Sequence, residues 1–178
     1  MKTRMFGRMV FIVGSMLLFA ASSWAASSPK IGWFDFQAVV DQSRNGKQAA
    51  DEFKRETERL KADMDVKANA LKTAKEELDK KKGVMDEAAK NKKNKELQEL
   101  QGEAQKFYME SEATLGKLRN ELMAPIANKV MEIVRKIGKD DKYDYIIERD
   151  KGGIVFSIDK DDLTKRLVEE LDKTTLKK

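Results

Sequence analysis

The placement of proline constrains this chain more than any other feature of its sequence. The 178 residues include two prolines, Pro29 and Pro125, and the interval between them is dominated by charged residues and by Ala, Leu and Gln. Most of these residue types are good helix formers. Beyond Phe36, the aromatic residues of the interval are Phe53, Phe107 and Tyr108. The interval therefore predicts long helices with few large side chains to bury.

Apolar spacing predicts that two such helices pair. In the first stretch, two series repeat every seven residues with an offset of three or four, a pattern typical of the a and d positions of a coiled coil. They are Thr57, Met64, Leu71, Leu78 and Met85, and Phe53, Leu60, Lys67, Ala74 and Lys81. Their small and charged members indicate a thin, flexible pairing. A second stripe, expected from near Lys95, comprises Leu97, Leu100, Ala104, Phe107, Ser111, Leu115, Leu118 and Leu122.

Residues 80–95 separate the two stripes and are rich in lysine. Gly83 and the asparagines Asn91 and Asn94 permit a turn there. We therefore expect an antiparallel helical hairpin with arms of ~50 Å; the alternative is one continuous rod that pairs with other chains. The second stripe continues into Ile126, Val130, Ile133, Val134 and Ile137. Pro125 lies at this change, and we expect a kink there, where the arm meets a compact body.

The two ends of the chain predict that body. Ile31–Phe34 suits a strand, and Asp35 suits the cap of a following helix, with Phe34 and Val39 packed around it. Near the other end, residues 143–147 and 154–158 are apolar runs around a glycine-bearing loop, which predicts a β-hairpin. Asp159 is then expected to cap a last helix. The buried face of that helix is expected to comprise Leu163, Leu167, Val168 and Leu171.

The predicted fold class is α+β and mostly α. We expect a signal peptide at 1–25, a body from 26–50 and 125–178, and helical arms over 51–124 with a basic tip near 80–95. A body of this size is marginal by itself, and its small sheet has open edges, so we expect self-association through the body. The expected interface residues are Ile31, Trp33, Phe34, Tyr145, Ile146, Ile147, Val155 and Phe156.

The first twenty-five residues have the pattern of an export signal. Three basic residues precede an apolar run from Met9 to Ala20, and Ser23–Ala25 offers small side chains at the positions that signal peptidase reads. The alternative, a membrane anchor, is disfavoured because the twelve apolar residues from Val10 to Ala21 would rise only ~18 Å as a helix against ~30 Å of hydrocarbon. We expect cleavage after Ala25 and a soluble mature chain.

Composition argues against catalysis. The sequence has no cysteine and no histidine, which removes disulfide staples, the commonest general base and the commonest metal ligand. We expect no enzyme activity, no cofactor and no metal. Without the signal peptide, the net charge of +5 falls to about +2, which gives little support for nucleic-acid binding.

The lysine-rich tip has two interpretations. Its lysines are Lys80, Lys81, Lys82, Lys90, Lys92, Lys93 and Lys95. They form either a solvated loop or a basic end that contacts anionic lipid headgroups or acidic segments of a bound protein. The sequence leaves both interpretations open.

The mature chain resembles the Skp/OmpH family of periplasmic chaperones. The matching segments are Lys30–Asp35, Gly46-Lys47, Pro125-Ile126, residues 143–147 and Asp162–Thr164, in the order that the family shows. The resemblance implies a homotrimer whose strands form a central β-barrel and whose arms surround a cavity. It also implies a periplasmic, ATP-independent holdase that binds unfolded outer-membrane β-barrel proteins. Some family members have been linked to lipopolysaccharide, through residues that are not carried over here.

A structural role is the main rival. In that interpretation the apolar stripe serves wholly to pair the arms, and the protein is an envelope spacer whose tips tether it to membrane or wall. Gly102 and Gly116 favour the chaperone, because glycine inside a helix would loosen the arm.

Overall fold

The computed structural model describes residues 28–176, so the predicted signal peptide lies outside the described residues. Residues 1–30 and 31–178 form two separate units, and every element belongs to the second. In chain order these are β1 (Ile31–Phe34), α2 (Phe36–Gln42), α3 (Arg44–Lys81), α4 (Glu87–Asp140), β2 (Tyr145–Glu148), η1 (Asp159–Asp161) and α5 (Thr164–Asp172). Within 28–176, no helix has the length and apolarity that a membrane span requires.

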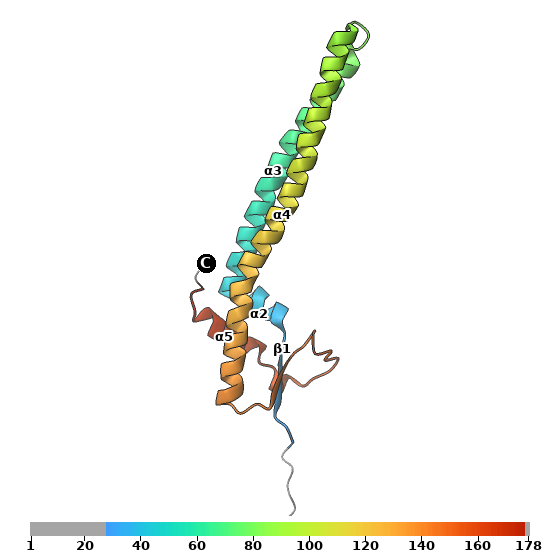
Figure 1. Cartoon of the computed structure of the whole chain (residues 1–178). Helices are drawn as coiled ribbons and strands as arrows, with labels where there is room; N and C mark the ends of the chain where they lie inside the picture. The colour runs from blue at the N-terminus through green and yellow to red at the C-terminus, as the bar shows by residue number, and fades with distance from the viewer. Residues whose placement is uncertain (1–27, 177–178) are drawn as a thin grey trace, which may run out of the picture. The chain divides into compact units, whose positions relative to one another are not determined.

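The long helices α3 and α4 lie side by side and run in opposite directions, joined by a short turn over residues 82–86 (Figure 1). The expected start of the second helix near Lys95 is wrong, because α4 begins at Glu87. The side chain of Asp86 accepts a hydrogen bond from the Ala89 backbone N–H at 2.7 Å, which caps the helix at that point. Asn91 and Asn94 consequently lie within α4 and take no part in the turn.

The first arm also begins earlier than expected, at Arg44, after a break at Ser43. The Ser43 hydroxyl donates to the Val40 carbonyl at 3.1 Å and accepts from the Gly46 backbone N–H at 3.1 Å, so it ends α2 and caps α3. A Cβ at Gly46 would lie 1.8 Å from the Val40 carbonyl oxygen. Only glycine therefore fits where the two helices meet.

Pro125 lies inside α4, which continues without a break to Asp140. The proline removes one backbone hydrogen bond, at a cost of ~3 kcal/mol in an isolated helix interior. Directly beyond it, the half-buried stripe gives way to buried Ile126, Val130 and Ile133. Packing of this face against the body offsets the lost hydrogen bond and keeps the helix continuous.

The sheet has two parallel strands, and the expected β-hairpin is wrong. β2 pairs with β1, with Ile31 opposite Tyr145 and Phe34 opposite Glu148. On its other side β1 forms a bridge to Asp162, next to which the Leu163 N–H donates to the Trp33 carbonyl at 2.8 Å. β1 is therefore the central strand, and the long helical crossover permits the parallel pairing.

Residues 154–158, the expected second strand of that hairpin, have no regular structure. Val155 is 98% exposed and Phe156 is 87% exposed. In a single chain their side chains find no apolar surface to pack against, so strand formation gains little there. An apolar run specifies that it is to be buried, but it does not specify its partner.

The core of the body lies between α2, the end of α4 and α5. Its buried members include Phe34, Val39, Val40, Ile126, Val130, Ile133, Val134, Ile137, Leu163, Leu167 and Leu171. The predicted packing of Phe34 and Val39 and the predicted face of the last helix are confirmed, with Val168 packed at the edge of the core.

Two caps in the body also bear on the predictions. The Asp35 cap is confirmed, since its carboxylate accepts from the Ala38 N–H at 2.8 Å. The Asp159 cap is wrong, because Asp159 opens the separate turn η1. Asp162 instead accepts from the Thr164 N–H at 2.8 Å, and the Thr164 hydroxyl accepts from the Asp35 N–H at 3.0 Å, which ties α5 to β1.

Candidate functional site

The seam between α3 and α4 is thin, and most of the expected residues line it. Within residues 51–124 the fully buried side chains are Leu60, Ala74 and Ser111, and the other stripe residues are half-buried. Thr57 and Lys81 were expected in the seam but are exposed, while Glu56 lies partly buried beside it. The pairing therefore uses up most of the apolar stripe and leaves the outer faces of both helices polar.

Lys67 shows how a lysine occupies a seam position. Its Nζ lies 3.7 Å from Glu103 Oε2 and 5.5 Å from the centre of the Phe107 ring. The ammonium group therefore has an anion and an aromatic face on the opposite helix. Nearer the tip, Lys93 forms a second bridge, with Nζ 4.0 Å from Glu77 Oε2 and 2.8 Å from Glu96 Oε2. The hydrogen bond to Glu96 raises the pKa of Lys93.

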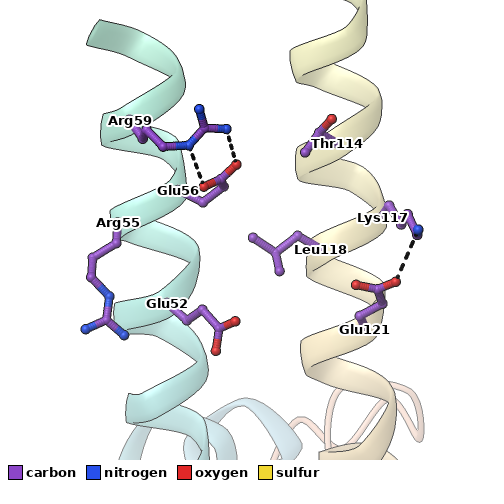
Figure 2. A pocket seen from close by; sticks show the side chains of 8 residues that line it. All are labelled: Glu52, Arg55, Glu56, Arg59, Thr114, Lys117, Leu118 and Glu121. Atoms are coloured by element: carbon purple, nitrogen blue, oxygen red, sulfur yellow. Dashed lines mark hydrogen bonds and ion pairs between the residues drawn. The ribbon is translucent and has the colours of Figure 1, made fainter. Parts of the chain in front are cut away.

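Closer to the body, the two helices border a groove of about 490 Å³ (Figure 2). Leu118 extends from α4 toward α3 and is the apolar side chain of its lining. The other lining residues are Glu52, Arg55, Glu56, Arg59, Thr114, Lys117 and Glu121. The ion pairs drawn there stay within one helix: Arg59 bonds Glu56 at 2.7 and 2.9 Å, and Lys117 lies 3.6 Å from Glu121.

These ion pairs shift the acid–base properties of the groove. The hydrogen bond from Arg59 lowers the pKa of Glu56, and the same bond raises the pKa of Arg59. Both groups are therefore charged at neutral pH. The described residues also contain no cluster of His, Cys, Asp or Glu that could hold a metal ion. The chemistry on offer is non-covalent contact with a polar or mixed-charge surface.

The seven tip lysines surround the turn between the long helices. Lys80 and Lys81 end α3, Lys82 follows them, and Lys90, Lys92, Lys93 and Lys95 lie on α4. Lys82 pairs with Asp79 at 3.3 Å, Lys90 with Glu87 at 2.8 Å and Lys95 with Glu99 at 4.0 Å. Within the described part of the chain, Lys80, Lys81 and Lys92 make no ion pair. Val84 stands among them, 89% exposed.

The expected interface residues divide into covered and exposed groups. Phe34 is 2% exposed and Trp33 is 9% exposed, so both are already buried within one chain, and Ile146 and Ile147 are half-buried. Ile31, Tyr145, Val155 and Phe156 are exposed. Ile31 and Tyr145 are direct partners in the sheet and therefore lie next to each other.

Arg149 connects this surface to the body. Its backbone N–H donates to the Phe34 carbonyl at 2.8 Å, its guanidinium lies 3.7 Å from Asp35 Oδ2, and it stands 5.8 Å from the centre of the Trp33 ring. Sequence reasoning missed this residue, as it missed the Asn45 amide that donates to the Leu171 carbonyl at 3.2 Å. Both contacts join segments more than a hundred residues apart, so no local pattern announces them.

Comparison with known proteins gives one family and one fold. The family model "Outer membrane protein (OmpH-like)" matches residues 30–171. A Caulobacter crescentus protein assigned as an OmpH-like outer membrane chaperone has a similar solved structure, with a TM-score of 0.72 and 17% sequence identity. The match covers 83% of this chain and 86% of that one. No curated protein sequence matches the chain.

Proposed function

Since the chain belongs to the OmpH-like family, we propose that it is a periplasmic, ATP-independent holdase chaperone that binds unfolded outer-membrane proteins and prevents their aggregation. The observation that carries the proposal is the arm. Two paired helices of 38 and 54 residues extend a surface that offers polar and mixed-charge contacts but no catalytic or metal-binding cluster among the described residues. Many weak contacts of this kind hold an unfolded chain without trapping it.

We propose further that the protein acts as a homotrimer joined through the body, with the strands of three chains completing a β-barrel. The exposed residues Ile31, Tyr145, Val155 and Phe156 support this, because burial of such side chains is favourable by ~25 cal/mol per Å². Residues 154–158 then have a neighbouring chain to pair with. The cavity for the client lies between the three arms.

Ile146→Asp tests the assembly. The substitution puts a charge on a half-buried strand residue that packs at the edge of the core, so we expect light scattering to report monomers. Val155→Asp is the sharper variant, since this side chain touches little within one chain and its change leaves the fold of the monomer intact. A trimer that survives Val155→Asp contradicts the proposed interface.

The chaperone activity is tested with an unfolded outer-membrane β-barrel protein diluted out of denaturant. We expect stoichiometric amounts of the protein to suppress turbidity without ATP. Turbidity that rises as fast as in the buffer control contradicts the proposal.

A shortened arm separates the chaperone from a structural spacer, the second candidate. Lys67 faces Glu103 and Glu77 faces Lys93, so removal of residues 61–74 together with 96–109 takes two heptads from each helix and keeps their register. The arm then loses ~21 Å, while the tip and body remain. A chaperone loses protection of large clients first. A spacer shows no client protection at either length.

The tip lysines are proposed to contact anionic lipid or lipopolysaccharide, or acidic segments of the client. We expect Lys80→Glu, Lys81→Glu and Lys92→Glu together to reduce sedimentation with phosphatidylglycerol vesicles at low salt, and not with phosphatidylcholine vesicles. The matched control is the same charge change on the body, at Lys139, Lys151 and Lys160. Unchanged binding to vesicles, lipopolysaccharide and client assigns the tip to solvent.

A further inference from the structure

One buried polar group in the arm has no partner. Ser111 lies in the α3–α4 seam with 9% of its surface exposed, and its Oγ is the one buried side-chain polar atom of the described residues that makes no hydrogen bond. A buried hydroxyl without a partner weakens the packing around it. Alanine would fill almost the same space without that cost.

Two glycines flank Ser111 on the same helix. A Cβ added at Gly102 or at Gly116 meets no atom within 4 Å. Neither position therefore requires glycine for space, and glycine inside a helix lowers its stability because the unfolded chain gains freedom. Between residues 102 and 116 the helix thus carries three residues that weaken it, each where alanine fits.

Contacts across the seam change at the same level. Lys67 and Glu103 mark the tipward limit of this stretch, and beyond them Lys93 and Glu77 provide another bridge between the helices. Toward the body, the helices instead border the groove, where ion pairs remain within one helix (Figure 2). Glu56, another polar side chain beside the seam, lies here, 26% exposed.

We propose that this mid-arm segment, residues 54–68 of α3 and 102–116 of α4, is a flexible joint built into the arm. The tipward part of the arm bends there relative to the part that is continuous with the body. The inference goes beyond the proposed function, because it concerns the motion of the arm without any client. In a chaperone, such a joint adjusts the enclosed volume to clients of different size.

Spin labels on either side of the joint test the proposal. The chain has no cysteine, so Gln98→Cys and Asn128→Cys place one label tipward of Gly102 and one bodyward of Gly116, both at exposed positions of α4. A straight helix separates them by ~45 Å. Doubly labelled chains are diluted into excess unlabelled chains, so that each measured distance lies within one arm. We expect a broad distribution with a tail to shorter distances.

The triple variant Gly102→Ala, Ser111→Ala, Gly116→Ala is expected to narrow that distribution about twofold. Hydrogen exchange at residues 102–116 should slow about fivefold for each glycine replaced. The matched control, Thr73→Ala with Asn91→Ala and Asn94→Ala, also adds three alanines at exposed helical positions but leaves the joint intact, and should not change the width. A wild-type distribution as narrow as that of the triple variant overturns the joint, as does equal narrowing by the control. No client is present, so failure of the holdase proposal does not affect the result.

Discussion

The body and the arm of this protein belong to one chain but are stabilised in different ways. In the body, Val39, Val130, Leu167 and Leu171 are completely buried, and segments from both ends of the chain meet around them. In the arm, residues 51–124, almost every side chain remains in contact with water. The body depends on burial of apolar surface, whereas the arm depends on helix propensity, a thin seam and ion pairs between neighbouring turns.

The difference teaches where substitutions are tolerated. Ion pairs one turn apart, such as Lys54–Glu58 and Lys106–Glu110, contribute ~0.3–0.5 kcal/mol each, so the arm has many small contributions and no single critical one. The core of the body is the opposite case, because each buried side chain contributes several times as much.

The largest expected effect comes from the core of the body. Leu167→Ala removes a fully buried side chain and leaves a cavity between α5 and its neighbours, so the free energy of unfolding should fall by ~2–5 kcal/mol. Urea denaturation followed by circular dichroism measures it. Leu97→Ala, a half-buried arm residue, serves as the comparison and should cost clearly less. Equal losses would remove the distinction between the two regions.

Next comes the junction at Gly46. A methyl group there overlaps the Val40 carbonyl oxygen, so Gly46→Ala must displace α2 from α3 and should lower the free energy of unfolding by ~1–3 kcal/mol. Gly102→Ala makes the same chemical change in open space and should raise the free energy of unfolding by ~1 kcal/mol. Thermal melts of the two variants in parallel check the opposite signs.

A smaller effect is expected at the seam lysine. Lys67→Met keeps an unbranched side chain but removes the charge, and the exposed Glu103 loses its partner to water at little cost. Replacement of a partly buried charge by an apolar group of similar shape is usually neutral or favourable. We expect the free energy of unfolding to rise by less than ~1 kcal/mol, measured by urea denaturation. A marked loss would show that the ion pair holds the arm together.

The smallest effect concerns acid. The pKa of Glu56 is lowered in the folded state by Arg59, so its contribution to stability is present at neutral pH, above the pKa of the unfolded chain. It is lost as pH falls through the folded pKa, below that of an ordinary glutamate. Glu56→Gln should therefore make the arm slightly less stable at pH 7 but not at acid pH. Hydrogen exchange of residues 52–60 at both pH values checks this, and a difference that grows on acidification would contradict it.

The sequence predicts the local parts of the fold well. The seam residues of α4, the Asp35 cap and the buried face of α5 all follow from spacing along one helix, and each is found as expected. Periodicity carries this information because one face of a helix is defined by neighbouring turns. The start of α4 was missed because the Asp86 cap is a single residue in a stretch where lysine and asparagine suggested a longer turn.

What the sequence predicts poorly are partners distant along the chain. The runs 143–147 and 154–158 looked like one hairpin, but β2 pairs with β1, more than a hundred residues away. Gly46 was read as a marker of the arm start, and only the Val40 carbonyl beside it shows why glycine stands there. The orphan hydroxyl of Ser111 was hidden for the same reason, since serine occurs on a helical stripe without comment until its neighbours are known.

The pairing of β1 with β2 has a consequence for how the molecule is made. Strand β1 emerges first from any translocating chain, and its partner follows only after the whole of α3 and α4. The two helices form from local contacts, and their closure brings the residues on either side of them into proximity at low entropic cost. The arm is thus the connection that must close before the sheet can be completed, so a defect that slows its zipping should delay the body as well.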